Sequence, residues 1–233
     1  LERELDRDAM PYMSAPGPHR LNRTEFGNAI QDLLRLNVNP ALLLPPDDFT
    51  RGFDNIVSAL GSEMTPARKA AYDIAAERVT ELAMSNSASR EVLFECRAEN
   101  QIDDKDIACA QRFIASFAPH AFRRPLADSE ETALLDVYRT GAFRGNYRSF
   151  DGGMQVLLKS ILTDSRFLYR TEAEPANVSS GQTYRLSDFE LTSRLSYFLW
   201  SRGPDEQLMD IAGRGQLSNP TVLEQEARRM LKD

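Results

Sequence analysis

Apolar side chains recur every three to four positions in successive blocks of this chain, and this spacing constrains the fold more than any other feature. In the block that begins near residue 65, Ile74, Ala75, Val79 and Leu82 fall on one face of a helix. Similar blocks begin near residues 22, 103, 128, 154, 187, 204 and 219. We therefore predict an all-α protein of about eight helices, with strands only in short pieces such as 182–186.

Residues that favour helix starts support several of these blocks. Asn22 can cap a helix while Glu25, three residues later, returns to the cap, and Ser187 forms the same capping box with Glu190. Before the block near residue 65, Thr65 stands in the cap position and a proline follows it, as is typical of a first helical turn. The helices are therefore predicted to begin at Asn22, Thr65 and Ser187.

Prolines and polar stretches predict where helices end. Pro119 and Pro125 should bound a turn after the third helix, and Asp128 with Glu131 should cap the next one. Breaks along the chain predict a linker at 1–20, a first helical domain at 21–88, a second at 89–175 and the start of a third at 176–233. The chain opens at Leu1 and stops within a helical pattern, so we expect a piece of a longer protein.

Composition restricts the classes of partner. The chain has 233 residues, of which 42% are hydrophobic and 27% charged, as expected for a folded protein. Its net charge of -7 argues against nucleic acid as a partner, because phosphate backbones favour basic surfaces. No apolar run approaches the roughly 18 residues of a membrane helix, so we expect no membrane span in this stretch.

The two cysteines, Cys96 and Cys109, allow two interpretations. A disulfide between them would stabilise the fold by about 3 kcal/mol, as estimated for a loop of ~15 residues. Two buried free thiols are the alternative, and composition alone does not separate them.

Three carboxylates on a loop rich in proline and glycine form the best candidate metal site. Asp47, Asp48 and Asp54 could ligate a hard cation such as Ca²⁺, which takes oxygen ligands from loops, although their spacing is not that of an EF-hand. The alternative is structural: Asp47 or Asp48 caps a turn, and Asp54 pairs with an arginine such as Arg20, Arg23 or Arg51.

Other polar residues give weaker signals. Arg123 and Arg124 follow a helix end, where they can either complement the helix dipole or clamp an anion. The two histidines, His19 and His120, are solitary, and Trp200 is either a core residue or a platform for a sugar ring. The sequence has no Gly-x-Ser-x-Gly elbow, phosphate-binding loop or His-x-Glu motif, so we assign no catalytic residue.

Several short segments of the sequence together resemble three successive helical domains of unknown function. Those domains belong to a planctomycete-type, cytochrome c-associated family of multidomain proteins. The segments that carry the resemblance occur in the expected order from residue 19 onward. They are His19–Phe26, Leu44–Asp48, Gly52–Asn55, Ala121–Leu126, Ser165–Arg170, Tyr184–Ser187 and Ser193–Ser201.

The resemblance implies an exported protein (periplasmic, in the cell envelope or extracellular) whose helical domains scaffold or dock a c-type haem domain during electron transfer. This stretch has no Cys-x-x-Cys-His, so we expect the haem elsewhere in the protein or on a partner chain. An oxidising compartment favours the Cys96–Cys109 disulfide. Arg123 and Arg124 could then contact haem propionates.

Two other functions are compatible with the resemblance. The intact haem-containing protein could be an oxidoreductase that acts on extracellular polysaccharide or its fragments. Alternatively, the helical domains could be a purely structural module of the envelope.

Overall fold

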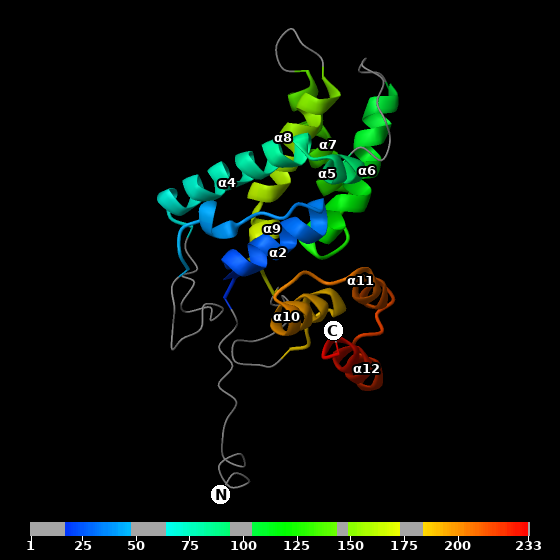
Figure 1. The fold of residues 1–233 in the computed structure, drawn as a ribbon. Coiled ribbons are helices and arrows are strands. Elements are labelled where there is room, and N and C mark those ends of the chain that lie inside the picture. Colours follow the sequence, from blue (N-terminus) through cyan, green and yellow to red (C-terminus); the bar gives the residue numbers. More distant parts are fainter. Residues whose placement is uncertain (1–16, 48–63, 94–103, 144–148, 173–183, 233) are drawn as a thin grey trace, which may run out of the picture.

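Helices dominate the computed structural model, which describes residues 17–47, 64–93, 104–143, 149–172 and 184–232 (Figure 1). The all-α prediction is confirmed. The α-helices are α2 (Arg23–Leu34), α4 (Pro66–Ser85), α5 (Ser87–Leu93), α6 (Asp104–Phe122), α7 (Asp128–Ala142), α8 (Phe150–Thr163), α9 (Ser165–Leu168), α10 (Asp188–Trp200), α11 (Glu206–Gly213) and α12 (Pro220–Met230), with a 3-10 turn η1 at Pro40–Leu42.

The strands described by the structure are two residues long and lie far apart in sequence. β1 (His19–Arg20) pairs with β2 (Tyr169–Arg170) in an antiparallel ladder, with His19 opposite Arg170. Residues 184–186, the described part of the expected strand at 182–186, form none. This pairing places the start of the segment His19–Phe26 against Tyr169–Arg170, near the end of the second predicted domain.

Local capping explains where most helices begin. Asn22 and Glu25 form the predicted capping box of α2, and Ser187 and Glu190 form that of α10. The Thr65 hydroxyl accepts a hydrogen bond from a backbone amide in the first turn of α4. The predicted starts at Asn22, Thr65 and Ser187 are confirmed. They are predictable because each capping residue bonds to a backbone amide only a few positions away.

Two predicted boundaries are wrong. α6 continues through Pro119 to Phe122, and the Arg124 amide then donates to the Pro119 carbonyl at 3.1 Å. A proline in the last turn removes only one helical donor, so it need not end the helix there. The N-cap of α7 is Ala127 rather than Asp128, because Glu130 reaches back to the Ala127 amide at 2.9 Å.

One hydrophobic core joins most of the helices. Its buried side chains come from α2, α4, α5, α6, α7, α8 and α9, and Tyr197 of α10 extends it. The largest members, each essentially without solvent exposure, include Phe26, Tyr72, Tyr138 and Phe167. The described parts of the first two predicted domains therefore share a core.

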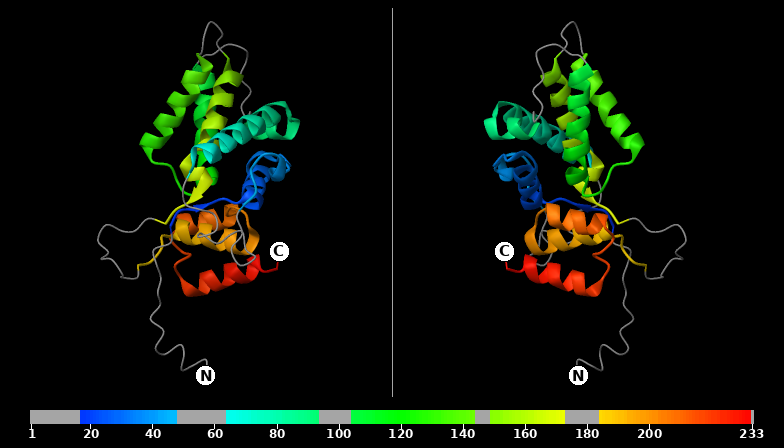
Figure 2. Two further views of the ribbon diagram at one scale, coloured as in Figure 1. Left: turned by 90° about the vertical axis from the view of Figure 1, so that its left-hand side faces the viewer. Right: turned by 90° about the vertical axis from the view of Figure 1, so that its right-hand side faces the viewer.

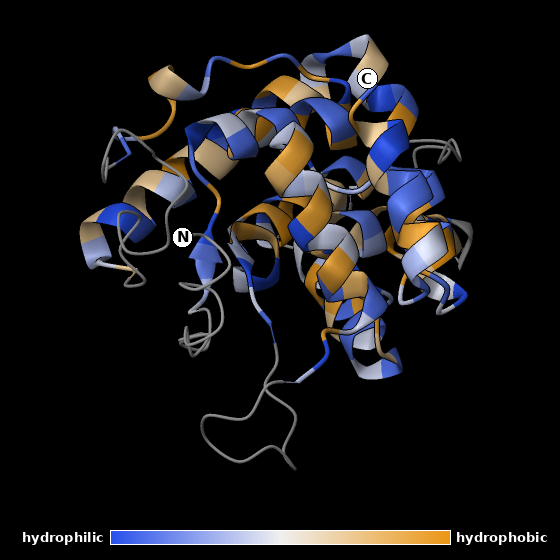
Figure 3. Ribbon diagram, turned by 90° about the horizontal axis from the view of Figure 1, so that it is seen from below, coloured by the Kyte–Doolittle hydropathy of each residue, from blue (hydrophilic) through white to orange (hydrophobic). Residues whose placement is uncertain are grey.

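Helices α10, α11 and α12 form a separate layer on one side of this core. Figures 1 and 2 show that layer against α2 and α9, on the side opposite α7 and α8. Figure 3 shows polar and apolar residues alternating around these helices, as expected where one face packs inward. In the described ranges, no helix is long and apolar enough to cross a membrane.

Close packing between α7 and α8 gives a test of this core. A Cβ added at Gly153 would lie 2.6 Å from Cδ2 of Tyr138 and 3.0 Å from Cβ of Ala142. We expect Gly153→Ala to lower the free energy of unfolding by about 1–3 kcal/mol, because overpacking outweighs the gain in helix propensity. Urea-induced unfolding measures this change.

Gly152→Ala is the matched control, because its Cβ would meet no atom closer than the Gly141 carbonyl oxygen at 3.4 Å. This variant should be unchanged or more stable by up to about 1 kcal/mol. Equal stabilities for the two variants would contradict the described packing of α8 against α7.

Candidate functional site

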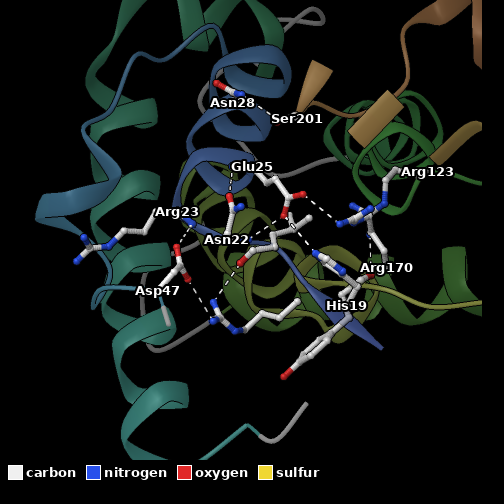
Figure 4. Close-up of polar contacts among 12 residues, drawn as sticks. His19, Asn22, Arg23, Glu25, Asn28, Asp47, Arg123, Arg170 and Ser201 are labelled. Carbon is white, nitrogen blue, oxygen red and sulfur yellow. Dashed lines mark hydrogen bonds and ion pairs between the residues drawn. The ribbon is translucent and has the colours of Figure 1, made fainter. Parts of the chain in front are cut away.

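A buried carboxylate stands at the junction of the helical units. Glu25 is 2% exposed, and one of its oxygens accepts from the Asn22 amide at 2.9 Å (Figure 4). The other oxygen accepts from Nη2 of Arg170 at 3.0 Å. Since a buried carboxylate is costly unless it is paired and hydrogen-bonded, both contacts are needed to hold it there.

A second buried ion pair joins Arg20, in the segment His19–Phe26, to Asp47, which follows η1. The guanidinium of Arg20, 4% exposed, donates to Asp47 at 3.2 Å, to the Tyr72 hydroxyl at 2.5 Å and to the Leu21 carbonyl at 3.1 Å. The other oxygen of Asp47 accepts from the Arg23 amide at 2.6 Å. Asp47 therefore pairs with an arginine; the structural interpretation expects that pairing of Asp54, which lies outside the described residues.

Of the predicted calcium ligands, Asp48 and Asp54 lie outside the described residues. Each oxygen of Asp47 accepts one N–H donor, so a cation at Asp47 would share these oxygens with the two hydrogen bonds. Elsewhere in the described ranges, no group of three His, Cys, Asp or Glu side chains is placed to hold a metal. A Ca²⁺ site at Asp47, Asp48 and Asp54 stays a prediction.

Arg123 connects the end of α6 to the α9–β2 segment. Its backbone is left-handed, with φ of 60°, and the side chain is 5% exposed. Nη1 donates to the carbonyls of Ala121 at 3.0 Å and Phe167 at 3.2 Å, and Nη2 donates to those of Arg166 at 2.7 Å and Tyr169 at 2.8 Å. One guanidinium thus fixes four backbone carbonyls.

Arg124 instead forms a partly buried ion pair. It donates to both oxygens of Glu130, at 2.8 and 2.7 Å, and Arg166 donates to the same carboxylate at 2.6 Å. The hydrogen bonds from Arg124 and from the Ala127 amide hold the pKa of Glu130 well below its usual range. An anion at Arg123 or Arg124 would compete with these contacts, so the haem-propionate contact stays a prediction.

Tyr197 anchors the α10–α12 layer. Its ring, 3% exposed, lies under the guanidinium of Arg170 at 4.6 Å and that of Arg123 at 5.8 Å. Such stacking is favourable because the ring face is electron-rich, especially where water is excluded. Burial raises the pKa of the Tyr197 hydroxyl. Arg170 therefore contacts both Glu25 of α2 and Tyr197 of α10.

Polar contacts also join α2 to the segment after α10. The side-chain amide of Asn28 donates to the Ser201 carbonyl at 2.9 Å (Figure 4), and Arg202 donates to Asp32 at 2.5 Å. Ser201 is left-handed, with φ of 53°, and so turns the chain away from α10. These contacts place the 200–206 segment opposite α2.

A cleft of about 910 Å³ opens where these elements meet. Its walls come from α2, α5 and α6 and from the 200–206 segment, so all three predicted domains contribute. The structure brings Trp200, His120 and Arg123 together in this lining, whereas His19 and Asp47 lie elsewhere. The Trp200 indole donates to the Met230 carbonyl at 2.9 Å, and the indole is only partly buried.

His19 is held neutral beside the junction. Its Nε2 lies 3.9 Å from a Glu25 oxygen and has no hydrogen-bond partner among the described residues. Burial, followed by the nearby charges of Arg170 and Arg20, lowers the pKa of His19 to about 3. Protonation of this imidazole is therefore opposed by the folded structure.

Cys109 is buried in α6, whereas Cys96 lies outside the described residues. The Cys96–Cys109 disulfide therefore stays a prediction.

The sequence does not indicate that Arg170, Tyr197 and Glu25 belong to one site. It indicates Glu25 only as a capping residue, and Arg170 only as part of a segment that resembles the family. No local pattern indicates that these side chains meet, because their contact depends on the β1–β2 pairing.

Three family models match successive parts of the chain. They are described as PSD3, protein of unknown function (DUF1587), at residues 19–85; PSD5, protein of unknown function (DUF1595), at residues 109–172; and PSD4, protein of unknown function (DUF1592), at residues 186–233. The chain therefore contains three successive domains of these families, which confirms that part of the resemblance. Comparison with curated proteins and with solved structures gives no match.

The neutral state of His19 predicts a pH dependence of stability. The unfolded chain takes up a proton near pH 6.5, whereas the folded chain takes it up only near pH 3, so falling pH favours unfolding across this window. We expect His19→Asn to reduce the slope of unfolding free energy against pH by up to about 1.4 kcal/mol per pH unit. Urea unfolding at several pH values measures it.

His120→Asn is the control, because this histidine is exposed. It should keep the slope of the unsubstituted protein. If His19→Asn also kept that slope, His19 would not be buried in its neutral form.

Proposed function

We propose that this chain is the helical scaffold of an exported, multidomain c-type cytochrome protein that takes part in electron transfer in the cell envelope. The three helical units would set the position of a haem domain located elsewhere in the protein or on a partner chain. In an oxidising compartment, the Cys96–Cys109 disulfide would add to the stability of the scaffold.

The observation that carries the scaffold role is the structural use of the most distinctive polar residues. Arg20 and Asp47 pair with each other, Arg123 binds four carbonyls, and Glu25 binds Arg170. The Glu25–Arg170 pair joins the first and second matched domains, whereas the hydrogen bonds of Arg20 and Arg123 fix segments within one domain. A rigid frame of this kind suits the positioning of a partner, because a preorganised surface loses little conformational freedom on binding.

The link to a haem domain rests on the family resemblance, which the order of the three matched domains supports. Arg124 is the more accessible of the two arginines suggested for propionate contact, since it is only half-buried. The structural-module hypothesis shares the scaffold but lacks the haem partner.

The oxidoreductase hypothesis receives support from the cleft, because active sites commonly lie in clefts between domains. In that case the intact haem-containing protein would oxidise polysaccharide or its fragments.

The proposal is tested on the product of the complete reading frame, purified from the cell envelope. We expect a c-type haem spectrum that survives denaturation, and cross-links between the haem-bearing part and α4 or α8 through Lys69 and Lys159. Those two lysines are accessible, with 64% and 43% of their side-chain surface exposed.

A haem-free product that also recruits no haem protein would contradict the proposal and favour the structural module. Oxidation of oligosaccharide by the 233-residue chain alone would favour the enzyme instead.

A further inference from the structure

The cleft between α2, α5, α6 and the 200–206 segment has no part in the scaffold role, and we infer that it is a binding site for a short, neutral carbohydrate. Its volume of about 910 Å³ lies within the range of roughly 300–1,000 Å³ found for small-molecule pockets. This inference goes beyond the scaffold role and does not depend on it; it shares its class of ligand with the oxidoreductase hypothesis but requires binding alone, without turnover.

Most of the carboxylates that line the cleft are paired. Asp32 pairs with Arg202 at 2.5 Å, Glu91 lies 3.7 Å from Arg35, and Asp205 pairs with Arg229 at 2.8 Å, whereas the fourth carboxylate, Glu206, is exposed. An anionic ligand would require unpaired guanidinium groups, and a cation would require unpaired carboxylates. The lining therefore matches a ligand that carries no net charge.

Neighbouring donors and acceptors suit hydroxyl groups. Each hydroxyl both donates and accepts hydrogen bonds, so it can bond to a carboxylate oxygen and to a guanidinium N–H donor beside their ion pair. Arg202 with Asp32 and Arg35 with Glu91 offer two such arrangements on the α2 side. Ser116 and His120, both exposed on α6, add further polar groups on the wall formed by α6.

The cleft also provides apolar surface for the C–H face of a sugar ring. Trp200 is partly buried and lines the cleft, and the apolar side chains of Leu33 and Val92 lie in the same lining. An aromatic ring beside polar groups is suited to a ligand with one apolar face and a polar edge. A carbohydrate has this combination.

A peptide fits the lining less well. Peptides commonly add a strand to an exposed sheet edge or place an amphipathic helix in a continuous apolar groove. The lining contains neither β1 nor β2, and ion pairs interrupt its apolar surface. We therefore treat peptide binding as an outcome that would contradict the inference.

Trp200 is the only tryptophan of the chain and lines the cleft, so its fluorescence reports binding directly. The 233-residue chain is titrated with soluble cello-, manno- and xylo-oligosaccharides, with oligogalacturonate and a sulfated oligosaccharide as charged comparisons. We expect a saturable change in emission with at least one neutral series, and weaker or no binding of both charged series.

Ser116→Tyr should weaken that binding by about tenfold or more, because the larger side chain fills part of the cleft; tenfold in affinity corresponds to about 1.4 kcal/mol. Gln111→Tyr is the matched control, since Gln111 is exposed on the same helix but outside the lining. It should bind within about twofold of the unsubstituted chain. If Ser116→Tyr fails to fold by circular dichroism, His120→Ala takes its place with the same expected direction.

No saturable change with any neutral series would overturn the inference. Tighter binding of the charged oligosaccharides or of a mixed peptide library, or equal effects of Ser116→Tyr and Gln111→Tyr, would also overturn it. These results concern the cleft alone and leave the haem spectrum of the complete protein as a separate test.

Discussion

The arrangement of the helical units depends on the buried carboxylate of Glu25. This side chain closes the capping box of α2 and accepts a hydrogen bond from Arg170, whose guanidinium lies 4.6 Å over the ring of Tyr197. Removing one partner of a buried ion pair is strongly destabilising, because the remaining charge is left without compensation. One carboxylate thus joins elements of all three matched domains.

Arginine suits this junction for a geometric reason. The planar fork of Arg123 reaches four carbonyls of the α6 end and the α9–β2 segment, which a lysine ammonium with three donors could not do. Fixing that segment also fixes β2, and β2 in turn carries Arg170. The hydrogen bonds from Asn28 to Ser201 and from Arg202 to Asp32 then hold the 200–206 segment opposite α2, and the cleft lies between them.

Helices were predictable because their signals are local. Periodicity and the capping residues Asn22, Thr65 and Ser187 each act within a few positions. Pro119 gave a wrong helix end, because a proline in the last turn removes only one hydrogen-bond donor from the helix. The site was not predictable in the same way: Glu25 and Arg170 are 145 positions apart, and their contact follows from tertiary folding. The sequence indicates Trp200 by itself as a possible sugar platform, but the cleft that Trp200 lines forms only when residues of all three domains come together.

Hydrogen exchange on Glu25→Gln tests the central role of this carboxylate most directly. Glutamine can still close the capping box, so α2 keeps its start while Arg170 loses its charged partner. We expect faster amide exchange in α10 (Asp188–Trp200), with the exchange of α7 and α8 unchanged. Unchanged exchange in α10, or faster exchange confined to α2, would contradict it.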